Sequence, residues 1–340
     1  MRSLVLEQQG LLAMRETPKP VATPGEALVK VSAVGVCGSD IGSFKGLNAL
    51  VTYPRVMGHE VCGVIEKIEG ANNSGLLEGD KVVLVPYLSC GKCIACKRGK
   101  VNCCCALSVY GVHHDGTMAE YFTAPTDNLV RVDSNMSPSV AAMIEPFAIS
   151  AHAVRRSGVC FGETLLVLGA GPIGMGAAAV AVSLGARLIL ADIDESRRSF
   201  AGERFGFQHV LDPNDPSFKQ SVIDLTDGWG ATHIIDSTGN AASMTGAVNL
   251  LANGGRLVYV GIFKGDLSLY HPEFHRRETE LMGSRAALTE DFRYVIDCVA
   301  SGRINLENFI THSAPFSTAE ESFEEWIRLG GKVFKAVLTL

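Results

Sequence analysis

The sequence lacks the long uninterrupted apolar runs that mark secretion signals and membrane-spanning helices. Its N-terminal stretch, MRSLVLEQQGLLAMRE, contains no apolar core of the kind found in a signal peptide. The apolar stretch from Leu165 to Ala191 is broken by GAGPIG and by Gly185, so it does not predict a membrane helix. No short-period repeat or low-complexity tract is visible. These absences favour a cytoplasmic protein without a membrane partner.

The sequence also lacks an excess of positive charge. Lys and Arg number 30 and Asp and Glu number 36, which gives a formal net charge of -6. A field of that sign does not attract nucleic acid or anionic lipid, so we expect neither as a partner. A chain of 340 residues with 47% hydrophobic and 19% charged residues is typical of a globular protein with about two domains.

Cysteine, by contrast, is plentiful. The chain contains 10 cysteines, and six of them lie between Cys90 and Cys105. In a reducing compartment, cysteines bind metal or react more often than they form disulfides. The cluster therefore predicts a metal site.

The pattern of predicted secondary structure changes near the middle of the chain. The first part is β-rich, with short β-branched runs separated by Gly, Pro and polar turns. A helical stretch then begins at Ser137-Pro138, a pair that favours a helix N-cap and first turn. From Glu163 onward apolar strands alternate with helices, which indicates βαβ units and a parallel sheet. We place domain seams near residues 146 and 285.

A glycine-rich motif follows the first strand of the alternating region. It matches G-x-G-x-x-G and reads Gly169-Ala170-Gly171-Pro172-Ile173-Gly174. A strand precedes it and a helix of small residues follows, so the helix N-terminus can offer its free N–H groups to a pyrophosphate. The context predicts a dinucleotide site; the alternative is a glycine-rich turn in a domain that binds no nucleotide.

The next strand ends in an acidic residue. Asp192 lies 18 residues beyond Gly174, close to the spacing of an acid that accepts a hydrogen bond from a ribose 2′-hydroxyl. Its charge would repel a 2′-phosphate, so NAD is preferred over NADP. Arg197 and Arg198 lie nearby and make the preference for NAD over NADP moderate.

The cysteine cluster has the spacing of a structural zinc site. Cys90, Cys93 and Cys96 are followed by three adjacent cysteines, Cys103-Cys104-Cys105. Thiolates at these intervals can surround one ion tetrahedrally. Free thiols in a surface loop and an iron–sulfur cluster are the alternatives. Spacing alone does not choose the fourth ligand among the adjacent three.

A second group of metal-ligating residue types lies upstream. It includes Cys37, Asp40, His59 and Glu60. One thiolate, one imidazole and carboxylates favour an open zinc site that water or substrate completes. Taken singly, His59 would be structural and Cys37 a small buried hydrophobe.

Together these motifs resemble the zinc-dependent medium-chain alcohol dehydrogenases, in the branch of sorbitol and threonine dehydrogenases. The matching stretches are GVCGSD, YPRVMGHEVCGVI, CGKCIACKRGKVNCC, IEPFAISAHAVRR and VLGAGPIG. Two less specific stretches, GVHHDGTMAEY and GSRAALTEDF, are most similar to sugar-acid 5-dehydrogenases of the L-galactonate and L-gulonate type.

The resemblance implies an α/β fold with an inserted domain. A doubly wound Rossmann sheet, residues 146–284, would interrupt a GroES-like β-rich catalytic domain. That catalytic domain would comprise residues 1–145, with residues 285–340 returning to it. A homodimer or homotetramer is also implied.

The resemblance assigns roles to individual residues. Cys37 and His59 would hold a catalytic zinc, with Glu60 as a direct or alternating ligand. Glu145 would be a fourth ligand or a carboxylate that handles protons, and Ser39 would take the proton of the substrate hydroxyl. In the structural site Cys104 would be the fourth ligand, with Cys103 and Cys105 as bystanders.

One position departs from the family pattern. Many relatives have a histidine five residues after the ligand cysteine, where it passes the proton to solvent, and here that position is Gly42. Either a chain of water molecules or another histidine, His113 or His114, would take over this relay.

The implied reaction is the zinc-dependent oxidation of a secondary alcohol by NAD, on a small polyhydroxy substrate. A substrate carboxylate would need a cationic partner, for which Arg285 is the candidate; a surface or interface arginine is the alternative. The rival substrates are neutral polyols and L-threonine. The rival outside the enzymes is an inactive regulatory protein that binds zinc and NAD, although all the candidate ligands are present.

Overall fold

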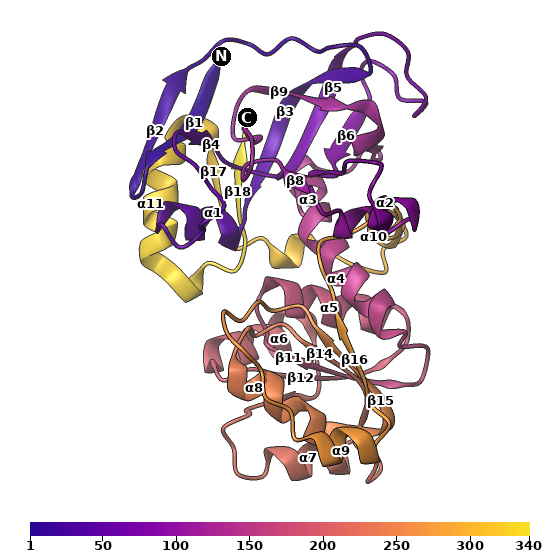
Figure 1. Cartoon of the computed structure of the whole chain (residues 1–340). Coiled ribbons are helices and arrows are strands. Elements are labelled where there is room, and N and C mark those ends of the chain that lie inside the picture. The colour runs from indigo at the N-terminus through magenta and orange to yellow at the C-terminus, as the bar shows by residue number, and fades with distance from the viewer. The chain divides into compact units, whose positions relative to one another are not determined.

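The computed structural model describes all 340 residues, and the chain divides into two compact units (Figure 1). Unit 1 comprises Met1–Glu145, Leu288–Ser301 and Asn305–Leu340, and unit 2 comprises Pro146–Ala287 and Gly302–Ile304. The sequence places the second seam near residue 285, and the contacts of unit 2 continue to Ala287. The Ser284 N–H donates to the Tyr259 carbonyl (2.8 Å) and so extends the pairing of the unit 2 sheet, which keeps Arg285 with unit 2.

Unit 1 is built on a seven-stranded mixed sheet. Its strands run in the order β10-β6-β5-β3-β18-β17, with β9 pairing β3 beyond this path. A three-stranded sheet (β2-β1-β4) and a two-stranded ladder (β7-β8) complete it. In Figure 1 the yellow C-terminal strand β18 lies beside the indigo β3, with which it pairs antiparallel. The C-terminal segment therefore supplies part of the same sheet as the N-terminal residues.

The elements of unit 1 are β1 (Arg2–Gln8), β2 (Leu11–Glu16), β3 (Glu26–Val36), α1 (Gly38–Phe44), β4 (Arg55–Val56), β5 (Glu60–Ile68), β6 (Lys81–Leu84), β7 (Tyr87–Leu88), α2 (Ile94–Lys97), η1 (Val101–Cys103), β8 (Ser108–Val109), β9 (Tyr121–Pro125), η2 (Thr126–Asn128), β10 (Leu129–Arg131), α3 (Pro138–Ala142), α10 (Thr289–Ala300), η4 (Glu307–Phe309), β17 (His312–Pro315), η5 (Phe316–Thr318), α11 (Ala319–Leu329), η6 (Gly330–Lys332) and β18 (Ala336–Thr339). Helix α4 (Ile144–Ser157) begins in unit 1 and continues into unit 2.

The core of unit 1 lies between its strands and helices α3 and α11. Helix α11 buries Phe323 and Trp326 on its apolar face, and α3 packs against β3, β5 and β18. The Ser137 Oγ accepts the Val140 N–H at 3.3 Å with Pro138 in the first turn, so the predicted N-cap is confirmed.

Unit 2 is a six-stranded parallel sheet with helices between its strands. The order is β13-β12-β11-β14-β15-β16, which is the doubly wound order 3-2-1-4-5-6. Strand β11 is buried along its whole length, as a central parallel strand must be. The α/β fold that the alternation predicted is confirmed.

The elements of unit 2 are the greater part of α4, β11 (Thr164–Leu168), α5 (Pro172–Ser183), β12 (Arg187–Ala191), α6 (Glu195–Phe205), β13 (Val210–Leu211), α7 (Phe218–Asp224), β14 (Ala231–Asp236), α8 (Ala241–Gly246), η3 (Ala247–Leu250), β15 (Leu251–Tyr259), α9 (His271–Arg276) and β16 (Glu280–Gly283).

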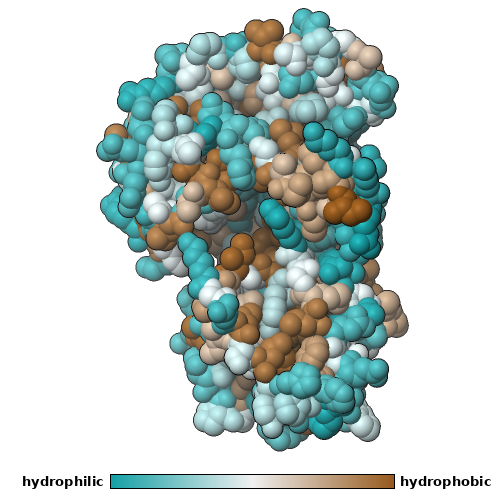
Figure 2. All heavy atoms as spheres, viewed as in Figure 1, coloured by the Kyte–Doolittle hydropathy of each residue, from teal (hydrophilic) through white to brown (hydrophobic).

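The surface alternates between polar and apolar residues. On the face drawn in Figure 2, short hydrophobic patches are separated by hydrophilic side chains. None of the helices combines the length and the apolar character needed to span a bilayer.

Candidate active site

Three metal-ligating side chains of unit 1 meet at one end of the β3–β5 pair. Cys37 follows β3 and caps α1, while His59 and Glu60 stand at the start of β5. Because β3 and β5 are antiparallel, with Gly35 opposite Glu60, the end of one strand lies beside the start of the other. The ligand atoms of Cys37, His59 and Glu60 all lie within 4.8 Å of one another.

A glycine makes room for this cluster. A Cβ placed on Gly35 would come within 2.2 Å of Glu60 Oε2 and 2.7 Å of the Met143 side chain. Any larger residue would therefore displace the Glu60 carboxylate from the group.

His59 is held between a carboxylate and a hydroxyl. Its Nδ1 is buried without a hydrogen-bond partner, 3.9 Å from Asp40 Oδ1, and its Nε2 lies 3.5 Å from Ser39 Oγ. Burial opposes a charge on the ring, but the neighbouring Cys37 and Asp40 raise the pKa of His59 well above its usual value. Asp40 is fixed in turn by the N–H groups of Cys37 (2.9 Å) and Gly58 (3.3 Å).

Glu60 is paired with a lysine from the far end of the chain. Lys335 Nζ lies 2.6 Å from Glu60 Oε1 and also contacts Oε2, and it donates to the Val36 carbonyl at 3.1 Å. Both side chains are buried. Burial lowers the pKa of Lys335, but Glu60, Cys37 and Glu145 together outweigh this and raise it. Sequence reasoning missed Lys335; a single lysine inside the apolar run VFKAVLTL was the available signal.

Glu145 lies beside this cluster without belonging to its 4.8 Å set. It stands in the first turn of α4, is 2% exposed, and accepts a 2.5 Å hydrogen bond from the Tyr87 hydroxyl on its Oε1. Its Oε2 is buried without a partner. Burial, together with the Glu60 charge, raises the pKa of Glu145 to about 7, while His59 acts in the opposite direction. Tyr87 was also missed, since no motif contains it.

The second cysteine group forms a separate lobe of unit 1. The sulfurs of Cys90, Cys93, Cys96 and Cys104 lie within 4.8 Å of one another, with Cys93 3.5 Å from Cys96 and 3.9 Å from Cys104. The N–H groups of Cys96 and Cys105 point to the Cys93 sulfur and lower the pKa of Cys93 to about 5. Cys103 and Cys105 are exposed and lie outside the set.

Both groups fit zinc chemically. Four thiols at this spacing match a closed tetrahedral site, and a thiol, an imidazole and a carboxylate match a site with an open position. The buried Oε2 of Glu145 has no hydrogen-bond partner, which is costly unless a ligand occupies it.

The glycine motif of unit 2 forms a tight turn between β11 and α5. Gly169 has φ +96°, a left-handed conformation that a glycine adopts without strain. A Cβ on Gly174 would lie 1.8 Å from the Gly169 carbonyl, so only glycine lets the helix pack this closely on the turn. Gly171 caps α5 and Pro172 and Ile173 form its first turn, which leaves the N–H groups of that turn available to an anion.

Asp192 stands at the end of β12, next to this turn. Its Oδ2 accepts the Ala170 N–H at 2.6 Å and its Oδ1 accepts the Asp194 N–H at 2.8 Å. Arg197 lies 3.6 Å from the same carboxylate and remains 40% exposed, whereas Arg198 turns away to the Asp192 carbonyl and to Asp212. The carboxylate is therefore fixed at the carboxyl edge of the sheet, where doubly wound folds bind their ligands.

Three further residues singled out from the sequence, Arg285, His113 and His114, belong to neither candidate metal group. Arg285 is exposed in unit 2. His113 and His114 bond within their own loop: the Val109 N–H donates to His113 Nδ1 at 3.1 Å, and His114 Nδ1 lies 3.3 Å from the Asp115 carbonyl.

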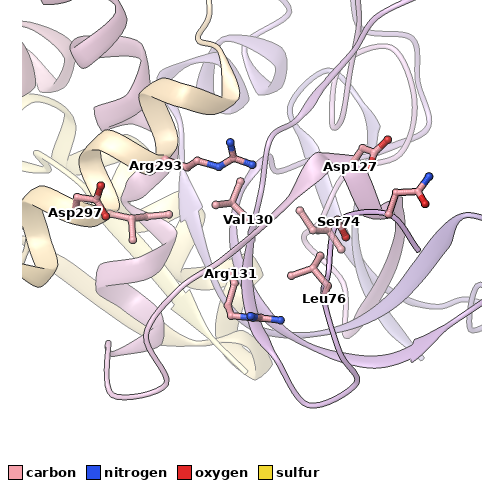
Figure 3. Close-up of a pocket in the computed structure, with 10 residues that line it drawn as sticks. Ser74, Leu76, Asp127, Val130, Arg131, Arg293 and Asp297 are labelled. Atoms are coloured by element: carbon pink, nitrogen blue, oxygen red, sulfur yellow. The ribbon is translucent and has the colours of Figure 1, made fainter. Parts of the chain in front are cut away.

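Unit 1 also carries a hollow away from the predicted ligands. It measures about 490 Å³ and lies between β10, the β5–β6 loop and α10, with Arg131, Arg293, Asp127 and Asp297 in its polar lining (Figure 3). None of the predicted site residues lines it.

Comparison with known proteins places these features in one family. Residues 23–134 match the alcohol dehydrogenase GroES-like domain, and residues 172–301 match the zinc-binding dehydrogenase domain. L-galactonate-5-dehydrogenase of Escherichia coli K12 is 42% identical over 339 residues, covering 100% of this chain and 99% of its own. A probable D-xylulose reductase A of Neosartorya fischeri is 33% identical, covering 95% and 92%.

A solved structure agrees over the whole chain. An alcohol dehydrogenase from Escherichia coli CFT073, crystallised with NADH, superposes with a TM-score of 0.91 at 31% identity, covering 100% of this chain and 99% of its own. The resemblance stated from the motifs is confirmed: this chain belongs to the zinc-type alcohol dehydrogenase family.

Proposed function

We propose that this chain is an NAD-dependent zinc dehydrogenase that oxidises a secondary alcohol of a sugar acid, at the 5-position of an L-galactonate- or L-gulonate-like substrate. The observation that carries the proposal is the Cys37–His59–Glu60 group with the unpartnered buried oxygen of Glu145 beside it. The full-length similarity to an L-galactonate-5-dehydrogenase supports the substrate class.

The residues of unit 1 would hold the catalytic zinc and accept the proton of the substrate hydroxyl. Cys37, His59 and one carboxylate, Glu60 or Glu145, would hold the catalytic zinc. When bound, zinc supplies a Lewis acid to the hydroxyl oxygen and NAD supplies the hydride acceptor. Ser39 would accept the hydroxyl proton, and Asp40 would orient His59 from behind. His113 and His114 bond within their own loop, which favours water molecules as the further relay past Gly42.

The residues of unit 2 would bind the cofactor. The first turn of α5 would receive the pyrophosphate, and Asp192 would accept the ribose hydroxyls. Arg197 already neutralises part of the Asp192 charge, which makes the preference for NAD weaker than a lone carboxylate would give. The four-cysteine lobe would hold a second, structural zinc through Cys90, Cys93, Cys96 and Cys104.

Arg285 is the proposed partner of the substrate carboxylate. A guanidinium binds a carboxylate through two parallel hydrogen bonds, and this geometry discriminates an acid from a neutral polyol. We expect the Arg285→Ala variant to lose turnover on L-galactonate and L-gulonate while keeping its turnover on sorbitol. An equal loss on acids and on sorbitol would exclude this role.

A neutral polyol is the second candidate substrate. The similarity to a probable D-xylulose reductase favours it, because that relative shares 33% of its residues over 95% of this chain. A screen of NAD reduction over L-galactonate, L-gulonate, sorbitol, xylitol and L-threonine separates the classes. The highest kcat/KM on an aldonic acid supports the proposal, and the highest value on a polyol or on threonine overturns it.

The Cys37→Ser variant tests whether the chain is an enzyme at all. We expect this variant to lose turnover with every substrate and to retain its affinity for NAD, since the cofactor residues lie in unit 2. Unchanged turnover would refute the assigned zinc site. No turnover in the unmodified protein with any substrate would favour a regulatory protein.

We place the active protein in the reducing cytoplasm as a homo-oligomer. No disulfide joins any of the 10 cysteines, and cysteines that bind metal are typical of that compartment. The sheet of unit 2 ends in the strand β16, whose outer backbone groups can pair with a second copy. Sedimentation of the purified protein tests the assembly.

A further inference from the structure

We propose that Tyr87 is a positioning residue, which holds Glu145 by one carboxylate oxygen and leaves the other free for the catalytic zinc or its water. The inference rests on the proposed zinc site. It concerns a residue outside every motif, on the short strand β7, which pairs with β8.

The two carboxylate oxygens of Glu145 have different surroundings. The Tyr87 hydroxyl donates to Glu145 Oε1 at 2.5 Å. Glu145 is 2% exposed, and its Oε2 has no partner at all. One oxygen is thus fully engaged and the other is fully available.

The surroundings identify what the available oxygen would meet. Glu145 interacts electrostatically with His59, Glu60 and Lys335, all of which belong to or contact the candidate ligand group. Lys335 is already committed to both oxygens of Glu60. A cation is therefore the partner that the unpaired oxygen lacks, and the Cys37 group is the nearby set that would hold one.

The backbone keeps the tyrosine in place. The Asn128 side-chain amide donates to the carbonyls of Val85 (2.8 Å) and Tyr87 (3.0 Å), and the Tyr110 N–H donates to Pro86 (3.1 Å). The hydroxyl therefore approaches Glu145 from a fixed segment. With Oε1 occupied by the Tyr87 hydroxyl, Glu145 would have only Oε2 to offer the metal or its water.

The Tyr87→Phe variant removes only the hydroxyl. Partners that orient a ligand typically change metal affinity by about 10- to 100-fold when removed, and we expect a loss in that range for zinc at the catalytic site. The affinity is measured by competition with a chromophoric chelator. The portion of bound zinc that is missing in the Cys37→Ser variant defines the catalytic site.

Two further variants separate positioning from general damage. Tyr110→Phe is the matched control, because Tyr110 also lies in unit 1 and its hydroxyl also has a hydrogen-bond acceptor, the Thr123 carbonyl (3.0 Å). In the double variant Tyr87→Phe/Glu145→Gln, the loss of zinc affinity should equal that of Glu145→Gln alone, since Tyr87 acts through Glu145.

Cobalt substitution gives an independent readout. We expect the visible spectrum of Co²⁺ at the catalytic site to change in Tyr87→Phe, as the second carboxylate oxygen becomes free to coordinate, and to stay unchanged in Tyr110→Phe. The proposal is overturned if Tyr87→Phe alters neither zinc affinity nor the cobalt spectrum more than the control does, or if the two losses add in the double variant. Failure of the dehydrogenase assignment would appear separately, as an absence of turnover in the unmodified protein.

Discussion

The loss of the Lys335 ammonium group should destabilise unit 1. Lys335 is 4% exposed and pairs with Glu60, which is fully buried, so its replacement leaves an uncompensated carboxylate in the interior. We expect Lys335→Met to destabilise unit 1 by about 3–5 kcal/mol, the usual cost of breaking a buried pair. Urea unfolding of the metal-free protein measures it. Lys332→Met is the control, because Lys332 is exposed, and its effect should stay within about 0.5 kcal/mol. Equal effects of the two substitutions would contradict the prediction.

Asp192 should determine which nicotinamide cofactor the protein prefers. Its carboxylate would accept ribose hydroxyls, and a hydrogen bond to a charged group contributes about 1.5–3 kcal/mol. We expect Asp192→Ser to lower kcat/KM for NAD by roughly ten- to a hundredfold and to raise the relative use of NADP, with Arg197 left free to meet the 2′-phosphate.

A neighbouring aspartate supplies the control for this change. Asp194 caps α6 by accepting the N–H groups of Ser196 and Arg197, so Asp194→Ala should cost about 1 kcal/mol of stability without altering the ratio of the two cofactors. If Asp194→Ala shifts the ratio as far as Asp192→Ser does, the specificity does not reside in Asp192.

At the scale of single elements, the turn between β11 and α5 tolerates no side chain at Gly174. An added methyl group would lie 1.8 Å from the Gly169 carbonyl, a contact that backbone must move to relieve. We expect Gly174→Ala to lower the melting temperature and to abolish NADH binding, measured by the fluorescence of the bound cofactor. Gly246→Ala, in α8, meets no atom within 4 Å and should be neutral or stabilising by about 0.4–1 kcal/mol. Normal NADH binding by Gly174→Ala would refute this account of the turn.

The four-cysteine lobe should depend on metal for its structure. Between Cys90 and Cys105 only Asn102 and Cys104 are buried, so the segment has almost no core of its own. We expect a strong chelator to make residues 90–105 sensitive to trypsin, which has cleavage sites there at Lys92, Lys97, Arg98 and Lys100, and added zinc to restore protection. Cleavage at the same rate before and after chelation would exclude a structural metal in this lobe.

The features that could be predicted best from the sequence are those whose residues lie close together along the chain. The turn at Gly169, the strand ending at Asp192 and the cysteine spacing each lie within a few residues, where local periodicity and spacing carry the information. Lys335 and Tyr87 could not be found that way, because their partners Glu60 and Glu145 are 275 and 58 residues away. Pairings of that kind arise from sheet topology, and the Glu60 pair depends on β18 lying beside β3.

At the scale of the whole molecule, the two units should respond to different ligands. The predicted cofactor residues lie in unit 2 and the predicted zinc residues lie in unit 1. Ligand at a hundred times its Kd stabilises the folded state it binds by about 2.7 kcal/mol. In hydrogen exchange with mass spectrometry, we expect NAD to slow exchange in peptides from β11 to α6, and chelation to speed exchange around Cys37, His59 and Cys90–Cys105.

Changes in hydrogen exchange confined to the other unit would contradict this assignment of ligands to units. Protection by NAD confined to peptides of unit 1, or loss of protection on chelation confined to unit 2, would mean that the binding residues have been placed in the wrong part of the chain.

The pairing of Lys335 with Glu60 also has a consequence for biosynthesis. Lys335 is made 275 residues after Glu60, an interval of roughly 15–55 seconds at ribosomal speeds of about 5–20 residues per second. During that time the nascent catalytic unit has an acidic side chain without its countercharge and a sheet without β18. Unit 2 is contiguous apart from Gly302–Ile304, and nearly all of it emerges within this same interval. The zinc site can therefore mature only after Lys335 and β18 have been synthesised, and the unfinished N-terminal segment is the stage at which chaperones would have most reason to bind.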